Sequence, residues 1–586
     1  MSAVSVLLTE KIKDIIKKTQ GVEVKDLVLE HPANEKFGDF ATSIAMSLAK
    51  KVEKDPWEIA QEIAGELKGA DLSFESSKDH YPIFSSIEAV KPGFVNLTLS
   101  EEWLKEQITE VLEAGDKYGS SNVGQNKNII IEYSQPNPNK PMHIGHARNN
   151  FLGSSLAQIL KFVGYNVTKM NYMNDWGTHI CKSMLMYQKY GNDEEPNKKS
   201  DHLVGDFYIM YEKEHGKNPE SLETELAEMF KKMESGDAKT LEIWKKITEW
   251  AYKGWEETYK DENVSFDTWV YQSNYTSAGK EIVDLAIRKG IAKKDKSGAV
   301  IAKLEKYGMP DKVMLRSDGT SIYITQDTQL AKDNYEKYNF DKRIYVVDSR
   351  QSDYFRQLFK VLELLGFEWA KKLYHLAYGW VSLPEGAMSS RTGAVVNADD
   401  VFKKLNNLER DEVRNSIKEV ENLDTTSRNL ALAAFRYGIL KIDSRQDIVF
   451  DYAKVTKFEG NTGPYLMYTY ARAKSILEKA GIGEKDLEFS LKKYESIKMT
   501  DKELALVRAV YKFPEVVIEA ANGFAPHVVA NYLYETAQRF NSFYADTPVL
   551  NAKGDVRSCR EGLVKCLSVV MKNGLGLLGI KVVEKM

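Results

Sequence analysis

The sequence of 586 residues has little cysteine and no long apolar run. Its three cysteines, Cys181, Cys559 and Cys566, lack the spacing of zinc ligands, and their odd number argues against a disulfide framework. We therefore expect no zinc and a reducing, cytoplasmic environment. No stretch reaches the roughly 20 apolar residues that a membrane span needs, and the short apolar run at the N-terminus is not typical of a secretory signal. We therefore expect no membrane association.

The balance of charges is also unremarkable for a globular protein, with a net charge of −4 and 28% charged residues. This charge neither indicates nor excludes a nucleic-acid ligand, because such proteins can concentrate Lys and Arg locally. We find no internal repeat. At about 150 residues per domain, the length predicts three or four domains.

Hydrophobic patterns predict an α/β protein with a helical C-terminal part. A buried strand begins at residues 129–131, a loop rich in Pro and Asn spans residues 135–141, a helix runs from about Met142 to Val163, and a strand spans residues 166–172. This order is typical of a Rossmann-like parallel sheet. We predict a small α/β domain at residues 1–118, in which Phe37 opens a helical stretch that continues to Lys51. We also predict a Rossmann-like domain at residues 125–405, with a helical insertion at about 190–265. An all-helical domain follows at residues 406–586.

The strongest chemical signal lies where the loop meets the helix. Pro141 suits the first position of a helix, and His143 and His146 are three residues apart, which places them on one helix face. A helix N-terminus favours phosphate, and the missing side chain of Gly145 leaves room for a flat adenine. Two histidines at this spacing also occur as packed residues or metal ligands. The strand, loop and helix around them favour the nucleotide site.

The run His143-Ile144-Gly145-His146 resembles the HIGH motif of class I aminoacyl-tRNA synthetases, and its flanks resemble the arginyl-tRNA synthetases in particular. The resemblance implies that His143, Gly145 and His146 bind ATP. It also implies that Lys140, just before the motif, supplies catalytic charge together with His143 and His146.

The second motif of this class is a loop with the pattern Lys-Met-Ser-Lys-Ser, and residues 386–393 resemble it with glycines at both ends. Ala387 and Ser390 stand where the two lysines are expected, so the alternative is an ordinary glycine-bounded turn. The resemblance implies that Lys140 replaces the missing charge, with Arg391 as a second candidate. In this loop the resemblance assigns ATP binding to Met388, Ser389 and Ser390, and a catalytic role to Ser389 and Arg391.

Tyr323 and Asp327 are the candidates for reading a guanidinium, which has five donors in a planar fork. They are four residues apart and share one face if helical; the alternative is an ordinary surface pair. By resemblance they read the guanidinium of arginine. Many members of the family carry a glutamate where this chain has Gln272. The resemblance adds further arginine-binding candidates, namely Glu132, Gln135, Pro136, Asn137, His146 and Gln351.

The resemblance covers the chain from about residue 30 to its end and implies an arginine–tRNA ligase. Its substrates would be L-arginine, ATP with Mg²⁺ and tRNA(Arg), its first domain would contact tRNA, and its last would bind the anticodon. We expect a monomer. Alternatives are another class I synthetase, such as the zinc-dependent cysteinyl enzyme, or a small-molecule adenylate-forming enzyme. A synthetase-like RNA-binding protein also stays open because the loop lysines are missing.

Overall fold

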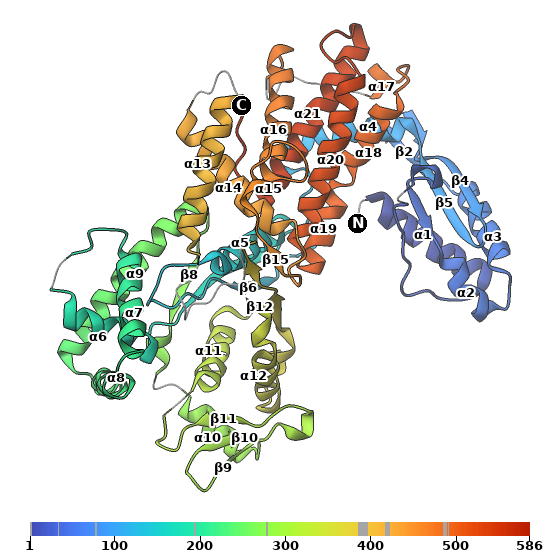
Figure 1. Cartoon of the computed structure of the whole chain (residues 1–586). Coiled ribbons are helices and arrows are strands. Elements are labelled where there is room, and N and C mark those ends of the chain that lie inside the picture. The colour runs from blue at the N-terminus through green and yellow to red at the C-terminus, as the bar shows by residue number, and fades with distance from the viewer. Residues whose placement is uncertain are drawn as a thin grey trace.

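The computed structural model describes residues 3–32, 34–76, 79–192, 195–276, 279–320, 322–384, 396–416, 422–483, 489 and 491–586. The chain forms an α/β centre, a small N-terminal α/β domain, a helical insertion and a C-terminal helical bundle, as predicted (Figure 1). In that view the N-terminal domain and the insertion lie on opposite sides of the bundle. Among the described helices, none combines the length and apolarity that crossing a membrane requires. All three cysteines are buried free thiols.

The central sheet has five parallel strands in the order β13-β12-β6-β7-β8. Neighbouring strands pair in a regular register. For example, Tyr345 of β12 lies opposite Glu132 of β6. Helix α5 follows β6, and helices α11 and α12 flank β12 in the chain. The bounds are β6 (Asn128–Glu132), α5 (Ile144–Phe162), β7 (Asn166–Met173), β8 (Thr268–Tyr271), α11 (Tyr323–Tyr338), β12 (Lys342–Asp348), α12 (Ser352–Leu364) and β13 (Leu373–Tyr378).

Two smaller parts interrupt this centre between β7 and α11. The predicted insertion is a cluster of helices with its own apolar core, and it includes Trp250. A three-stranded antiparallel sheet, in the order β11-β10-β9, lies beyond β8. The bounds are α6 (Thr178–Tyr190), α7 (Ser200–His215), α8 (Pro219–Glu234), α9 (Ala238–Asp261), α10 (Lys280–Arg288), β9 (Ala292–Lys294), β10 (Val300–Ala302) and β11 (Lys312–Leu315).

The N-terminal domain differs from the prediction at one place. The stretch from Phe37 to Lys51 is not one helix, because strand β1 (Phe40–Thr42) pairs with β5 (Phe94–Leu99) before helix α2 (Ile44–Val52) begins. The three residues of β1 are all buried, so continuous burial rather than helical periodicity explains the apolar pair Phe40 and Ala41. The other elements are α1 (Ala3–Gln20), α3 (Pro56–Gly69), β2 (Ser73–Ser76), β3 (Asp79–Pro82), β4 (Phe84–Val90) and α4 (Glu101–Ala114).

The C-terminal part is helical and holds the N-terminal domain by polar contacts. Arg508 donates from Nε to Asp39 at 2.7 Å, and Lys105 donates to the carbonyl of Ile497 at 2.5 Å. A short strand pair, β14 (Val381–Ser382) with β15 (Ile448–Val449), joins this part to the centre. The helices are α13 (Ala398–Ser416), α14 (Leu423–Leu440), α15 (Tyr452–Val455), α16 (Gly463–Lys479), α17 (Leu491–Tyr494), α18 (Asp501–Tyr511), α19 (Phe513–Gly523), α20 (Pro526–Asp546) and α21 (Gly554–Leu577).

Helix α5 is the structural link between the sheet and the bundle. Two buried arginines connect it to its surroundings by hydrogen bonds. Arg436 of α14 donates to the hydroxyl of Ser154 of α5 at 2.7 Å and to the carbonyl of Glu262 at 2.7 Å. The other, Arg148 of α5, donates at 2.7–3.5 Å to backbone carbonyls in two loops, those of Gly379, Trp380, Asp443, Ser444 and Gln446. Buried cations need such partners to offset the loss of water. The start of α5 is therefore fixed relative to both domains.

Candidate active site

The main cavity lies where the strand order of the central sheet changes direction. Strands β6 and β12 are neighbours, but the chain continues from β6 to β7 on one side and from β12 to β13 on the other. Ligands of open α/β sheets bind in the crevice at the carboxyl ends of strands at such a point. Here Glu132 ends β6 and Asp348 ends β12, and both line a cavity of about 810 Å³.

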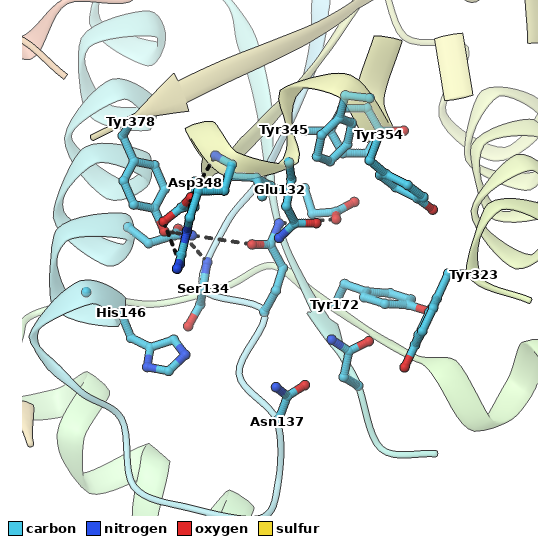
Figure 2. A pocket seen from close by; sticks show the side chains of 18 of the residues that line it. Glu132, Ser134, Asn137, His146, Tyr172, Tyr323, Tyr345, Asp348, Tyr354 and Tyr378 are labelled. Carbon is cyan, nitrogen blue, oxygen red and sulfur yellow. Dashed lines mark hydrogen bonds and ion pairs between the residues drawn. The ribbon is translucent and has the colours of Figure 1, made fainter. Parts of the chain in front are cut away.

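Figure 2 shows that this cavity has two different ends. Tyr172, Tyr323, Tyr345 and Tyr354 gather on one side, and His146 lies on the other. We call the first the carboxylate end, because Glu132 and Asp327 belong to it, and the second the histidine end, formed by His143 and His146.

The loop after β6 turns in an unusual backbone conformation before it reaches α5. Ser134 and Gln135 have positive φ values of 79° and 48°, which residues with a Cβ adopt at a cost. The amide oxygen of Asn149 accepts from Ser134 N at 2.8 Å, and that of Asn171 accepts from Gln135 N at 3.1 Å. Two asparagines on different elements therefore hold the turn that directs Gln135 into the cavity.

The histidine end is organised by the first turn of α5. His143 is the N-cap, and its Nδ1 accepts from Gly145 N at 3.0 Å, while His143 N donates to Nδ1 of His146 at 3.1 Å. The two rings lie 3.9 Å apart between centroids. A Cβ on Gly145 would lie 2.8 Å from the ring of His143, so glycine makes room for that ring. The histidines therefore cap the helix and face the cavity at once.

These contacts fix the protonation of both histidines. Burial lowers the pKa of His143 to about 4, with Lys140 and Arg350 adding to the effect, and burial holds the pKa of His146 well below its usual value. Both rings are therefore neutral at pH 7. Because each Nδ1 accepts a backbone N–H, each proton is on Nε2, which leaves one N–H donor per ring. Burial also lowers the pKa of Lys140, which lines the same end.

The carboxylate end contains two acidic side chains with different partners. Glu132 forms a buried ion pair with Arg343 of β12, and its other oxygen accepts from Gln135 Nε2 at 3.2 Å. Asp327, on the first turns of α11, accepts a hydrogen bond from the hydroxyl of Tyr354. Burial raises the pKa of Asp327 to about 7, although Tyr354 opposes the shift. An uncompensated carboxylate in a cavity is a site for a cation.

The loop after β12 brings one predicted residue and its neighbours to the rim. Gln351 and Arg350 both line the cavity. The guanidinium of Arg350 is tied to Asp348, with distances of 2.8 Å from Nε and 2.9 Å from the second nitrogen, and it lies 4.3 Å from the ring centroid of Trp380. Arg350 is thus already paired, which leaves Gln351 as the neutral polar group of this loop.

Gln272 lies beside the main cavity rather than in its lining. It is buried, its amide donates to Gln326 at 3.1 Å, and it lines a neighbouring cavity of about 580 Å³. Tyr323 lines both cavities, so the two adjoin.

The structure brings most of the predicted site residues together. The lining of the main cavity includes Glu132, Gln135, Asn137, Lys140, His143, Gly145, His146, Tyr323, Asp327 and Gln351. Pro136 is not part of that lining. Met388, Ser389, Ser390 and Arg391 lie outside the described residues. Their described flanks lie close by, since Val381 lines the cavity and the carbonyl of Val396 accepts from Ile144 N at 3.1 Å.

Several lining residues were not predicted, namely Tyr172, Arg343, Tyr345, Asp348, Tyr354 and Tyr378. Asp348 could have been found, because a carboxylate at the end of a predicted strand is a known signal. The tyrosines and Arg343 carry no such local signal.

Comparisons with known proteins identify the family of the chain. The chain matches three family descriptions: "Arginyl tRNA synthetase N terminal domain" over residues 7–99, "tRNA synthetases class I (R), catalytic domain" over residues 107–452, and "DALR anticodon binding domain" over residues 466–586. Fold and site are therefore those of a class I aminoacyl-tRNA synthetase.

Similar proteins narrow the class further. The chain is 37% identical to an arginine–tRNA ligase of Phocaeicola vulgatus over 99% of both chains, and 38% identical to one of Treponema denticola over 95% of this chain and 94% of the other. The arginyl-tRNA synthetase structure of Thermus thermophilus matches with a TM-score of 0.84 at 28% identity, over 99% of this chain and 100% of the other. That of Plasmodium falciparum has the same fold, with a TM-score of 0.81 at 21% identity over all of both chains. The chain belongs to the arginyl-tRNA synthetase family.

Proposed function

We propose that the chain is an arginine–tRNA ligase, which activates L-arginine with ATP and transfers it to the 3′ end of tRNA(Arg). One observation carries the proposal. A single cavity has neutral N–H donors at its histidine end and an uncompensated carboxylate, Asp327, at its carboxylate end. An amino acid with a cationic side chain fits between them, with its own carboxylate directed toward the nucleotide.

In this proposal the carboxylate end reads the guanidinium. Asp327 supplies the opposite charge and Tyr323, one turn earlier on α11, a hydroxyl. Glu132 and Gln135 form the wall on the side of β6, and Asn137, His146 and Gln351 contact the remainder of arginine. Pro136 acts indirectly, by stiffening the loop between Gln135 and Asn137. A pocket that pairs a guanidinium rejects substrates that leave its polar groups unpaired, by about 10⁴–10⁵-fold in favourable cases.

The histidine end would bind ATP, which enters as its Mg²⁺ complex. The N-terminus of α5 offers partial positive charge to the phosphates, and Gly145 keeps this turn open. His143 and His146 would donate from Nε2, and Lys140 would add charge. The proposal also assigns ATP contacts to Met388, Ser389 and Ser390 and catalytic charge to Ser389 and Arg391. These residues lie outside the described part of the chain.

The reaction then has two steps. A carboxylate oxygen of arginine attacks the α-phosphorus of ATP, the bond from that phosphorus to its bridging oxygen breaks, and pyrophosphate leaves. Negative charge grows on the α-phosphate oxygens, where positioned N–H donors lower the barrier. Next, the terminal ribose hydroxyl of tRNA attacks the carbonyl carbon of arginyl-adenylate. AMP leaves, and the hydroxyl proton is released.

Binding of tRNA(Arg) would use the C-terminal bundle, which matches an anticodon-binding domain, together with the N-terminal domain. We further propose that the ligase works as a cytoplasmic monomer. Light scattering on the purified chain, with and without tRNA, tests the oligomeric state.

Pyrophosphate exchange into ATP tests the function. We expect exchange with arginine, measured with and without tRNA, and charging of tRNA(Arg) with labelled arginine. Exchange with a different amino acid but none with arginine, in the presence of tRNA, would overturn the proposal. Lysine and citrulline are the matched controls, because the first keeps the charge without the planar fork and the second keeps the shape without the charge.

A further inference from the structure

The proposed arginine pocket already contains an arginine of the chain. Arg343 lies on β12 opposite Ile130 of β6, is 0% exposed, and lines the main cavity. Its terminal nitrogen pairs with Glu132, whose side chain is 7% exposed. The function proposed above assigns that end of the cavity to a second guanidinium, that of the substrate.

The contacts of Arg343 leave part of its hydrogen-bonding capacity unused. The ring of Tyr345 covers one face of the guanidinium, 4.5 Å from ring centroid to guanidinium carbon. Nε and the other terminal nitrogen find no hydrogen-bond acceptor among the described residues. A cation buried in this way is stable only beside a negative charge, since removal from water costs several kcal/mol even after relaxation. Glu132 is therefore committed to Arg343.

The charges at the carboxylate end can be counted element by element. Strand β6 contributes Glu132, β12 contributes Arg343, and α11 contributes Asp327. The other titratable groups that line this end are the phenols of Tyr172 on β7, Tyr323 on α11, Tyr345 on β12 and Tyr354 on α12. Burial raises the pKa of each phenol, so all four stay neutral near pH 7. The phenol of Tyr275, which follows β8 outside that lining, also interacts electrostatically with Arg343, and burial raises its pKa. With Asp327 ionised, the net charge of this end is −1.

We propose that Arg343 is a positioning residue that sets this charge: it neutralises Glu132, so that Asp327 alone balances the substrate and the pocket accepts a side chain with a single positive charge. The inference rests on the proposed function and refines it. Glu132 acts through Arg343 and Gln135, and it does not carry the charge of the substrate guanidinium.

Removal of the internal cation has a specific consequence. Without Arg343, the carboxylates of Glu132 and Asp327 would share this end of the cavity with no cation between them, and two such carboxylates cannot both ionise easily. A proton would then stay in the pocket to higher pH and compete with the substrate cation. The position of the acid limb in a pH profile therefore reports the role of Arg343, whereas a purely structural role would leave that position unchanged.

The test measures kcat/KM for arginine between pH 5.5 and 9 by pyrophosphate exchange with tRNA present. We compare Arg343→Met, which removes the charge at similar length, with Arg343→Lys, which keeps it. We expect the acid limb of Arg343→Met to move up by about 1 pH unit or more, and that of Arg343→Lys to stay near that of the unmodified chain. An unchanged limb in Arg343→Met would overturn the inference.

A double variant keeps the test decisive if Arg343→Met folds poorly. Glu132→Gln with Arg343→Met removes both members of the ion pair and restores a single carboxylate, so its acid limb should return to the position in the unmodified chain. A limb displaced upward from its position in the unmodified chain would contradict the inference. Failure of the unmodified chain to activate arginine would refute the proposed function instead, so the two failures are distinguishable.

Discussion

The two ends of the main cavity reach their polarity by different routes. At the histidine end, backbone N–H groups of one helix turn fix His143 and His146 as neutral donors. At the carboxylate end, side chains from β6, α11, β12 and α12 pair with one another, and the net charge depends on all of them. The first arrangement is local and insensitive to pH, while the second is dispersed through the chain and sensitive to each charge. At the histidine end the Nδ1 atoms of both rings meet backbone donors, whereas at the carboxylate end two nitrogens of Arg343 have no acceptor among the described residues.

The largest effect should come from removing the charge that balances the substrate. Asp327→Asn keeps the shape and can still accept from Tyr354, but it leaves the guanidinium without a counter-charge. Loss of one partner of a buried pair costs about 3–5 kcal/mol, so kcat/KM for arginine should fall by about 10²–10⁴-fold, mainly through KM. Asp333→Asn, on the same helix but lining a different cavity, is the matched control. Equal values for both variants in pyrophosphate exchange would contradict the assignment.

The histidine end should respond through kcat. His143→Asn keeps an N-cap, since asparagine also accepts from the backbone at this position, but it removes the Nε2 donor. We expect kcat for pyrophosphate exchange to fall by about 10²-fold with saturating substrates, which is typical of one lost transition-state donor. The unfolding temperature should differ from that of the unmodified chain by only a few degrees, because the variant keeps a helix cap. A large loss of stability with unchanged kcat would show that His143 only caps the helix.

The pH profile should separate the two ends directly. The pKa of Asp327 lies near 7, and its ionised form binds the cation, so kcat/KM for arginine should fall about tenfold per unit as pH drops below that value. Burial lowers the pKa of His143 to about 4 and holds the pKa of His146 well below its usual value, so the histidines should not titrate between pH 6 and 8. A profile of kcat/KM that stays flat from pH 5.5 to 8 would contradict the state of Asp327.

The smallest effect should be that of the exposed ion pair at the rim. Arg350 is 70% exposed in its side chain and bound to Asp348, and such pairs contribute little. Arg350→Gln should change KM for arginine by less than about threefold, whereas Gln351→Leu should raise it by about tenfold through a lost hydrogen bond. The reverse order would move the amino-acid contact from Gln351 to Arg350.

The same contrast explains what the sequence could reveal. His143, Gly145 and His146 are one helix turn, so the strand, loop and helix around them were enough to predict their place in the cavity. Tyr323 and Asp327 were predictable as a pair on one face of α11. Arg343 was not, because its partner Glu132 is 211 residues away and meets it only through the pairing of β12 with β6. Tyr354 and Tyr172 escaped prediction for the same reason.

Local signals also determined which parts of the fold could be predicted from the sequence. The strand and helix at residues 128–162 match the predicted unit to within two residues, because a buried strand, a Pro/Asn loop and an N-cap all mark its boundaries. The pattern from Phe37 to Lys51 predicts one helix, because burial of all three residues of β1 hides the alternation of a strand. The domain boundaries at residues 118 and 405 stay predictions, and helix α13 continues through the second one.

Arg148 also couples the position of helix α5 to that of two loops. Its guanidinium donates hydrogen bonds to five carbonyl groups in two loops. One loop leads into β14, and the other lies between α14 and β15. If either loop shifted relative to α5, some of these carbonyl groups would lose their hydrogen bonds to Arg148. A displacement of residues 443–446, in the loop between α14 and β15, would therefore be passed to Arg148 and to His143, which caps the same helix about one turn earlier.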